Sequence, residues 1–120
     1  MKALLLIVHG SRKASSTAEI ATLAKKVAAM PSSFEHVRHC FLELATPKMA
    51  SSIDELTQLG CNDITLMPYF LAEGSHVADD LPKLLSQAQH NHPTIHFTLM
   101  EHFGASQKMP SWILEYVNQS

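Results

Sequence analysis

The chain has 120 residues, of which 46% are hydrophobic, and its formal net charge at pH 7 is −2. That length predicts one domain, residues 1–120, with a hydrophobic core of its own. The small negative charge gives no electrostatic basis for binding nucleic acid or an anionic membrane surface. The apolar run that follows Lys2 is too short for a signal peptide or a membrane span, so we expect a cytoplasmic protein.

Four apolar runs predict the strands of a parallel sheet. They occupy residues 3–8, 37–44, 64–71 and 95–100, and each is short and rich in Leu, Ile, Val or Phe. Apolar runs without polar alternation are typical of strands that are covered on both faces of the sheet.

The segments between the runs have helical patterns. Residues 18–29 place their apolar side chains on one face of a helix. Thr46 and Pro47 are expected to be the N-cap and the first helical residue of a second helix, which Gly60 terminates.

Asp79 or Asp80, together with Pro82, is expected to open a third helix, and a fourth helix runs over about residues 109–117. The resulting order, a strand and a helix repeated four times, predicts an α/β fold with right-handed crossovers. We expect an open, flavodoxin-like sheet of parallel strands in the order 2-1-3-4, with helices on both faces.

Three residues with metal-binding side chains follow the predicted strands. His9 follows the first strand, Glu43 lies near the end of the second run, and His76 lies in the loop after the third. In open α/β sheets a ligand binds outside the carboxyl ends of the strands, where the strand order reverses, so all three are expected at one edge. Imidazole and carboxylate groups suit a divalent first-row metal ion, and two or three protein ligands leave coordination positions open.

The neighbours of the two histidines suit a substrate with carboxylate groups. Gly10 and Gly74 are expected to permit tight turns and close backbone approach beside each histidine. Ser11, near the start of the first helix, is expected to hold a substrate carboxylate, and Arg12 to clamp it with two hydrogen bonds. Ser75 completes the predicted substrate-binding set.

Three motifs in this order are similar to the signatures of a known family. They are His-Gly-Ser-Arg at residues 9–12, Phe-Leu-Glu at 41–43 with Pro47 after it, and segment 68–82, which begins Pro-Tyr-Phe-Leu-Ala-Glu-Gly-Ser-His. Together they resemble the small sirohydrochlorin cobaltochelatase family of cobalamin and sirohaem biosynthesis, over about residues 1–100. Residues 101–106 depart from the pattern of that family.

The resemblance implies a chelatase-like fold and the insertion of Co²⁺, Ni²⁺ or Fe²⁺ into sirohydrochlorin or a related tetrapyrrole. The metal ion is then a substrate, and we expect no organic cofactor. The resemblance also implies a homodimer, in which two short chains replace the two lobes of the larger chelatases. His9 and His76 match the histidines of the motifs and are expected to be metal ligands and proton acceptors, with Glu43 as a third ligand or proton relay.

Each of these residues also has an ordinary structural interpretation. His9 follows an apolar strand and could be a hydrogen-bonded structural histidine, while Glu43 could cap the helix at Thr46 or pair with Lys48. His102 is a further candidate because it follows the fourth strand at the same edge. The remaining histidines are expected to face solvent or to cap helices: His36, His39, His90, His92 and His96. Cys40 and Cys61 have no Cys-X-X-Cys spacing and are expected to be buried, reduced thiols.

Two rival functions use the same fold. A non-catalytic carrier of a metal ion or tetrapyrrole would keep the histidines but deliver its cargo to a partner protein. A flavodoxin-like regulator would carry a phosphate-accepting aspartate at a strand end, and none follows the first or the third predicted strand.

Overall fold

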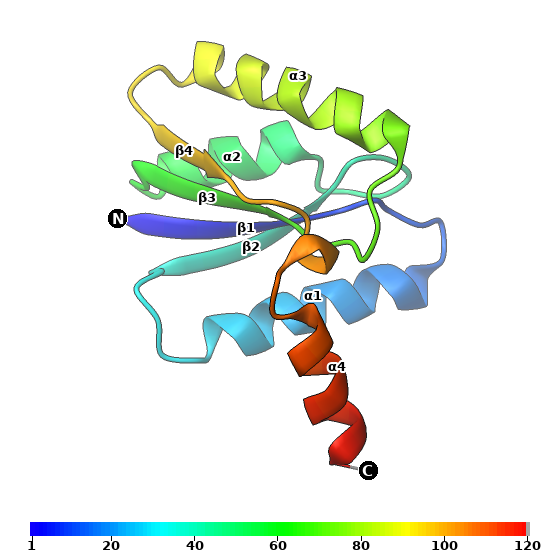
Figure 1. Ribbon diagram of the computed structural model, residues 1–120. Coiled ribbons are helices and arrows are strands. Elements are labelled where there is room, and N and C mark those ends of the chain that lie inside the picture. Colours follow the sequence, from blue (N-terminus) through cyan, green and yellow to red (C-terminus); the bar gives the residue numbers. More distant parts are fainter. Residues whose placement is uncertain (120) are drawn as a thin grey trace.

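The computed structural model describes residues 1–119, apart from the side chain of His76. The elements follow in the order β1 (Lys2–Val8), α1 (Ala14–Ala28), β2 (His36–Phe41), α2 (Met49–Gln58), β3 (Asp63–Pro68), α3 (Ser75–Asn91), β4 (His96–Leu99), the 3-10 turn η1 (Phe103–Ala105) and α4 (Met109–Asn118). All strand pairs are parallel, and the sheet has the order β2-β1-β3-β4 (Figure 1). The predicted fold class and strand order are therefore confirmed.

The hydrophobic core lies between the sheet and the layer of α2 and α3. Ala3, Leu5 and Ile7 alternate along β1 and are completely buried on this face, where they meet Ile53 and Leu56 of α2. Each fully buried Leu or Ile side chain stabilises the fold by roughly 1.5–3 kcal/mol. Helix α1 lies on the opposite face of the sheet (Figure 1) and packs against β2.

The strand register brings the carboxyl ends of β1, β2 and β3 to one edge of the sheet. Val8 of β1 is paired with Phe41 of β2, and Ile7 is paired with Pro68 of β3. Residues that follow these strands therefore meet at this edge, as the strand order predicted.

Helix α2 begins later than expected. Its N-cap is Lys48, and Thr46 and Pro47 belong to the turn that precedes it. The backbone N–H of Phe41 donates to the carbonyl of Pro47 at 2.8 Å, and Phe41 forms a parallel bridge with Lys48. Because these contacts hold Pro47 and Lys48 in extended backbone, the predicted cap at Thr46 is wrong. The second strand also ends at Phe41 instead of continuing to residue 44.

Helix α3 begins earlier than expected. It starts at Ser75 with Gly74 as its N-cap, so Asp79 and Asp80 lie within the helix instead of opening it. Pro82 also lies inside the helix. Val77, Leu81 and Ala88 are buried in the core, and this packing stabilises the helix on both sides of the proline.

The remaining helices agree more closely with the predictions. Helix α1 starts at Ala14, four residues before the predicted start, whereas α4 covers Met109–Asn118, close to the predicted 109–117. Helix α2 ends at Gln58, just before Gly60, as expected. Among the helices of residues 1–119, none is both long and apolar enough to cross a membrane.

Strand β4 differs from the prediction that every strand is covered on both faces. Phe97 and Leu99 pack against the core, but His96 and Thr98 are exposed on the other face. That face carries α1 over β2, and it is open to solvent at β4.

Both cysteines are free and buried, as predicted. Cys40 is completely buried beneath the helices, and burial raises the pKa of its thiol to about 12. The pKa of the Cys61 thiol is raised as well, chiefly by burial. A thiol with a raised pKa carries little thiolate near neutral pH and is therefore unreactive.

Candidate functional site

His9 is the first residue after β1, and its ring is half-buried at the sheet edge. The ring packs against the ring of Phe70, which follows β3, with centroids 4.4 Å apart. The carbonyl of His9 accepts a hydrogen bond from the backbone N–H of Glu43 at 3.0 Å. The ends of β1, β2 and β3 therefore meet at His9.

Gly10 allows the backbone beside His9 to approach the chain after β2. Its φ is +112°, which L residues rarely adopt, and a Cβ at this position would overlap the carbonyl oxygen of Glu43. The predicted close approach at Gly10 is confirmed. For Gly74 the same prediction is wrong, because its φ is −79° and a Cβ there would lie in open space.

Glu43 is exposed at the same edge, in the turn between β2 and α2. It does not cap α2, because the N-cap of that helix is Lys48. Within residues 1–119, no ion pair joins Glu43 to Lys48. Neither structural alternative for this carboxylate is observed.

Ser11 and Arg12 form the connection from the histidine to α1. The Ser11 hydroxyl accepts a hydrogen bond from the N–H of Lys13 at 3.1 Å, which turns the chain into the helix. Arg12 is exposed. A hollow of about 260 Å³ lies beside Ser11, lined by His9, Ser11, Thr17 and Tyr69 among others.

His76 is the second residue of α3, eight residues after the end of β3. Its side chain is outside the described part of the structure. Among the described side chains, no group of three or more His, Cys, Asp or Glu residues could hold a metal ion. The predicted set of His9, Glu43 and His76 includes the undescribed side chain, and it therefore stays a prediction.

Two residues that the sequence did not single out contact the candidate histidines. Glu73 lies 3.4 Å from His102, measured from Oε2 to Nδ1. Phe70, which packs on His9, is 7% exposed and belongs to an apolar segment. The sequence pattern around Phe70 indicates only a core residue, so it gave no sign of the contact with His9. The contact of Glu73 could not be predicted either, because its partner His102 is 29 positions away.

Within residues 1–119, none of the other histidines follows the end of a strand. His90 and His96 are exposed, as predicted, while His36 and His39 are half-buried. Burial lowers the pKa of His39. His92 is the C-cap of α3, again as predicted, and its Nε2 lies 2.9 Å from Oδ1 of Asp54.

Comparison with known proteins places the chain in a defined group. The family model described as CbiX matches residues 3–120. The sirohydrochlorin ferrochelatase of Priestia megaterium is 25% identical over 121 residues, which cover 100% of this chain and 45% of that protein. The sirohydrochlorin cobaltochelatase of Methanocaldococcus jannaschii is 34% identical over 92 residues, which cover 77% of this chain and 64% of the relative. The chain thus spans about half to two thirds of the length of these relatives.

Solved structures show the same fold. A protein from Marinobacter aquaeolei, assigned as CbiX of cobalamin (vitamin B12) biosynthesis, superposes with a TM-score of 0.83 at 24% identity, covering 99% of this chain and 96% of that one. The sirohydrochlorin chelatase SirB from Bacillus subtilis in complex with cobalt gives a TM-score of 0.80 at 21% identity, covering 98% of this chain and 50% of that one. SirB with Fe³⁺ gives a TM-score of 0.83 at 20% identity, with coverage of 98% and 46%.

Proposed function

This chain belongs to the CbiX family, and from that premise we propose that it inserts a divalent metal ion into sirohydrochlorin or a related tetrapyrrole. Relatives that bear the names sirohydrochlorin ferrochelatase and sirohydrochlorin cobaltochelatase support this reaction. The SirB structures with cobalt and with Fe³⁺ support cobalt and iron as the metals that the reaction uses. Ni²⁺ is a third candidate because imidazole ligands also suit it.

The observation that carries the proposal is the junction of His9 and Glu43. Their backbones are hydrogen-bonded at 3.0 Å, and Gly10 allows this close approach. An imidazole and a carboxylate thus start from adjacent points on the carboxyl edge of the sheet, where open α/β sheets bind ligands.

His9 and His76 hold the metal ion in this proposal, and Glu43 is a third ligand or a proton relay. Insertion replaces two pyrrole N–H bonds of the tetrapyrrole with metal–nitrogen bonds, and two protons leave. As coordination passes from the imidazoles to the pyrrole nitrogens, one freed histidine accepts a proton and passes it to solvent. The second proton leaves through Glu43 or water. No organic cofactor takes part in this step.

Ser11, which lines the hollow beside His9, binds the tetrapyrrole in this proposal together with Arg12, Gly74 and Ser75. Ser11 and Arg12 lie just before α1, where a hydroxyl and a guanidinium can hold peripheral carboxylates. Gly74 and Ser75 at the start of α3 supply backbone and hydroxyl groups to the same substrate.

Two copies of the chain pair in this proposal, with their carboxyl edges facing a shared cleft. The match to about half of the SirB chain supports this arrangement, because the homodimer then supplies a second lobe. We place the reaction in the cytoplasm, where thiols such as Cys40 and Cys61 stay reduced.

A metallation assay tests the function. Purified protein is mixed with excess sirohydrochlorin and Co²⁺, Fe²⁺ or Ni²⁺ under anaerobic conditions, and the absorption spectrum is followed. Many turnovers per chain with at least one metal are expected. Conversion that stops at one tetrapyrrole per chain would instead identify a carrier.

Three variants test the site. His9→Ala and His76→Ala should each abolish turnover while the circular dichroism spectrum is retained, and Glu43→Gln should reduce it less. His90→Ala is the matched control, because His90 is exposed near the opposite end of α3. Full activity of His9→Ala or His76→Ala would remove that residue from the mechanism.

A further inference from the structure

The loop between β3 and α3 joins two parts of the candidate site. It runs through Phe70, whose ring packs on His9, to Gly74, the N-cap of α3. Residues 71–75 are exposed, and Leu71 is 75% exposed. Burial in the core therefore ends at Phe70, and the rest of the loop depends on other contacts for its position.

The segment after β4 supplies such contacts. The N–H of Gly104 in η1 donates to the carbonyl of Phe70 at 2.9 Å. A Cβ on Gly104 would overlap the carbonyl oxygen of Leu71, so η1 lies directly against the start of the loop. Two positions earlier, Nδ1 of His102 lies 3.4 Å from Oε2 of Glu73. Contacts with this segment thus reach both the beginning and the end of the loop.

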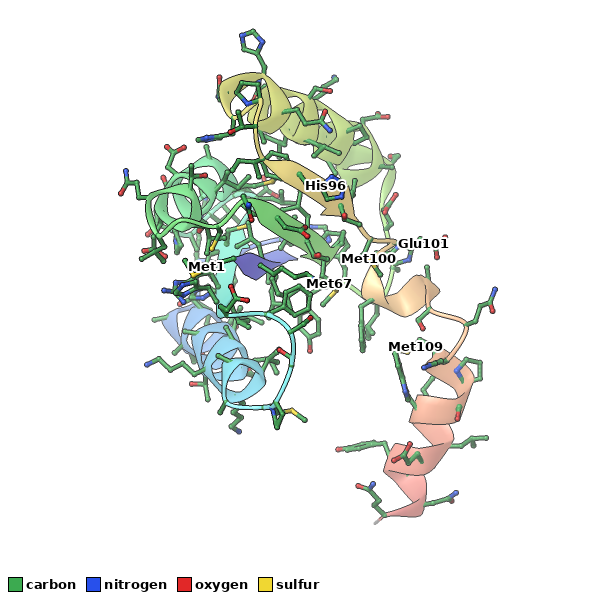
Figure 2. All side chains as sticks on the ribbon, turned by 90° about the vertical axis from the view of Figure 1, so that its left-hand side faces the viewer. Met1, Met67, His96, Met100, Glu101 and Met109 are labelled. Atoms are coloured by element: carbon green, nitrogen blue, oxygen red, sulfur yellow. The ribbon has the colours of Figure 1, made fainter. Side chains whose placement is uncertain are left out.

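The turn η1 is itself anchored. The ring of Phe103 stacks on the ring of Trp112 in α4, with centroids 5.1 Å apart and an interplanar angle of 12°. It also contacts the ring of Tyr69, with centroids 5.8 Å apart. Figure 2 shows Glu101 where the chain passes from β4 towards η1, and His102 follows as the N-cap of the turn. His102 therefore starts from a fixed base.

His102 opens onto a different hollow from His9. The hollow that His102 lines has a volume of about 400 Å³ and includes Met67, Met100 and Trp112 in its lining. Among the described residues, it shares no lining residue with the hollow beside His9. This placement favours an indirect role for His102 over the role of a metal ligand.

We propose that His102 is a positioning residue for metal insertion, which acts through Glu73 to hold the loop between β3 and α3. The carboxylate can only accept a hydrogen bond, so the Nδ1–H group of the imidazole is the donor. Because His76 is the second residue of α3 and Phe70 packs on His9, this loop sets how far apart the backbones of the two proposed ligands lie. This role rests on the proposed function, in which both histidines hold the metal ion.

The geometry of the contact sets the size of the expected effect. The side chains of His102 and Glu73 are 22% and 31% exposed, and 3.4 Å is longer than an ordinary hydrogen bond. A partly exposed pair of this kind changes an equilibrium by about fivefold at most. Loss of the pair should therefore weaken metal binding without abolishing it.

Binding of Co²⁺ in the absence of tetrapyrrole tests the pair. His102→Ala and Glu73→Ala should each raise the dissociation constant by about fivefold. The double variant should bind no more weakly than either single variant, because all three lack the same contact. Calorimetric titration gives the constants, and additive losses would contradict the proposal. Glu101→Ala, which removes an exposed carboxylate next to His102, is the matched control and should bind as the wild type does.

Two amide substitutions separate positioning from direct metal binding. In His102→Asn the side-chain amide nitrogen stands close to the position of Nδ1 and can donate to Glu73. In His102→Gln the amide nitrogen stands close to the position of Nε2 instead. We expect the wild-type affinity for Co²⁺ in His102→Asn, and in His102→Gln the same loss as in His102→Ala. Any other order of these affinities would overturn the role through Glu73.

Amide hydrogen exchange tests the same role without a metal ion. The N–H of Ala78 donates to the carbonyl of Gly74 at 3.0 Å, in the first turn of α3. In His102→Ala and Glu73→Ala this amide should exchange about fivefold faster, because the loop no longer holds the start of the helix. The amide of Tyr69, which is hydrogen-bonded to β1, should exchange as in the wild type. Unchanged exchange at Ala78 would refute the positioning role.

Failure of this role and failure of the proposed function give different results. If His102→Ala and Glu73→Ala bind Co²⁺ as tightly as the wild type, the positioning role is wrong and the metal site still stands. If the wild-type chain binds no Co²⁺, the metal site of the proposed function is wrong, and the positioning role is lost with it.

Discussion

The imidazole ring of His9 lies against the ring of Phe70, with centroids 4.4 Å apart and an interplanar angle of 36°. Phe70 is itself 7% exposed and part of the hydrophobic core. The contact therefore connects a candidate metal ligand to the packed interior, and it restricts the orientations that the imidazole can adopt.

The first prediction concerns this contact. Phe70→Leu should fold, because an apolar side chain still fills the site at a cost of about 1 kcal/mol. It should slow metal insertion by about tenfold, because the His9 imidazole loses the ring that positions it. Metallation kinetics and the thermal midpoint are measured together. Phe97→Leu, on β4, is the control; equal rates for the two variants would show that the ring contact has no role.

Gly10 and Gly74 make a matched pair for the second prediction. Gly10→Ala should destabilise the fold by about 2 kcal/mol or more, because φ is +112° and the new methyl group overlaps the carbonyl oxygen of Glu43. Gly74→Ala should change stability by less than about 0.5 kcal/mol, because the site is open. Urea denaturation gives both values. A Gly10→Ala variant as stable as wild type would contradict the close approach of these backbones.

The third prediction is the low reactivity of the cysteines. Cys40 is completely buried, and its thiol pKa is raised to about 12. In the folded protein at pH 8 neither Cys40 nor Cys61 should react with an aromatic disulfide reagent over minutes, whereas both should react at once in concentrated urea. Rapid reaction of either thiol with the reagent in the native protein would contradict this prediction. It would show that the layer of α2 over Cys40, or the segment before β3 that contains Cys61, opens readily.

His39 supplies the fourth prediction, which concerns pH. Burial lowers its pKa below the ordinary 6.5, so the unfolded chain takes up this proton at higher pH than the folded chain. The stability associated with neutral His39 is therefore complete above pH ~6.5 and is lost as pH falls through that value towards the folded pKa. His39→Gln should reduce the fall in thermal midpoint between about pH 7 and pH 5.

Nuclear magnetic resonance checks the same group directly. The ring protons of His39 should titrate below pH 6.5 in the folded protein. A midpoint at or above that value would contradict the prediction, even if the His39→Gln variant proved more resistant to acid.

The sequence by itself determined the order of elements and the sheet edge that carries the candidate site. An apolar run such as the one that forms β1 is typical of a strand that is covered on both faces of a sheet. The alternation of strands with helices then requires a parallel sheet. Once the strand order is known, the positions of His9 and Glu43 after β1 and β2 follow from chain connectivity. The order of elements and the positions of these two residues follow from the local sequence pattern, and few contacts between distant segments are needed to infer them.

Only the tertiary structure decided the helix starts and the contacts of the site. Thr46 and Pro47 have the pattern of a cap, yet pairing of Phe41 with Pro47 and Lys48 moved the start of α2 to Met49. The contacts of Phe70 with His9 and of Glu73 with His102 join segments far apart in the chain. The exposure of α4 has the same origin. Its periodicity predicts an apolar face, but whether that face is covered depends on how η1 docks against the end of β3, which no local pattern encodes.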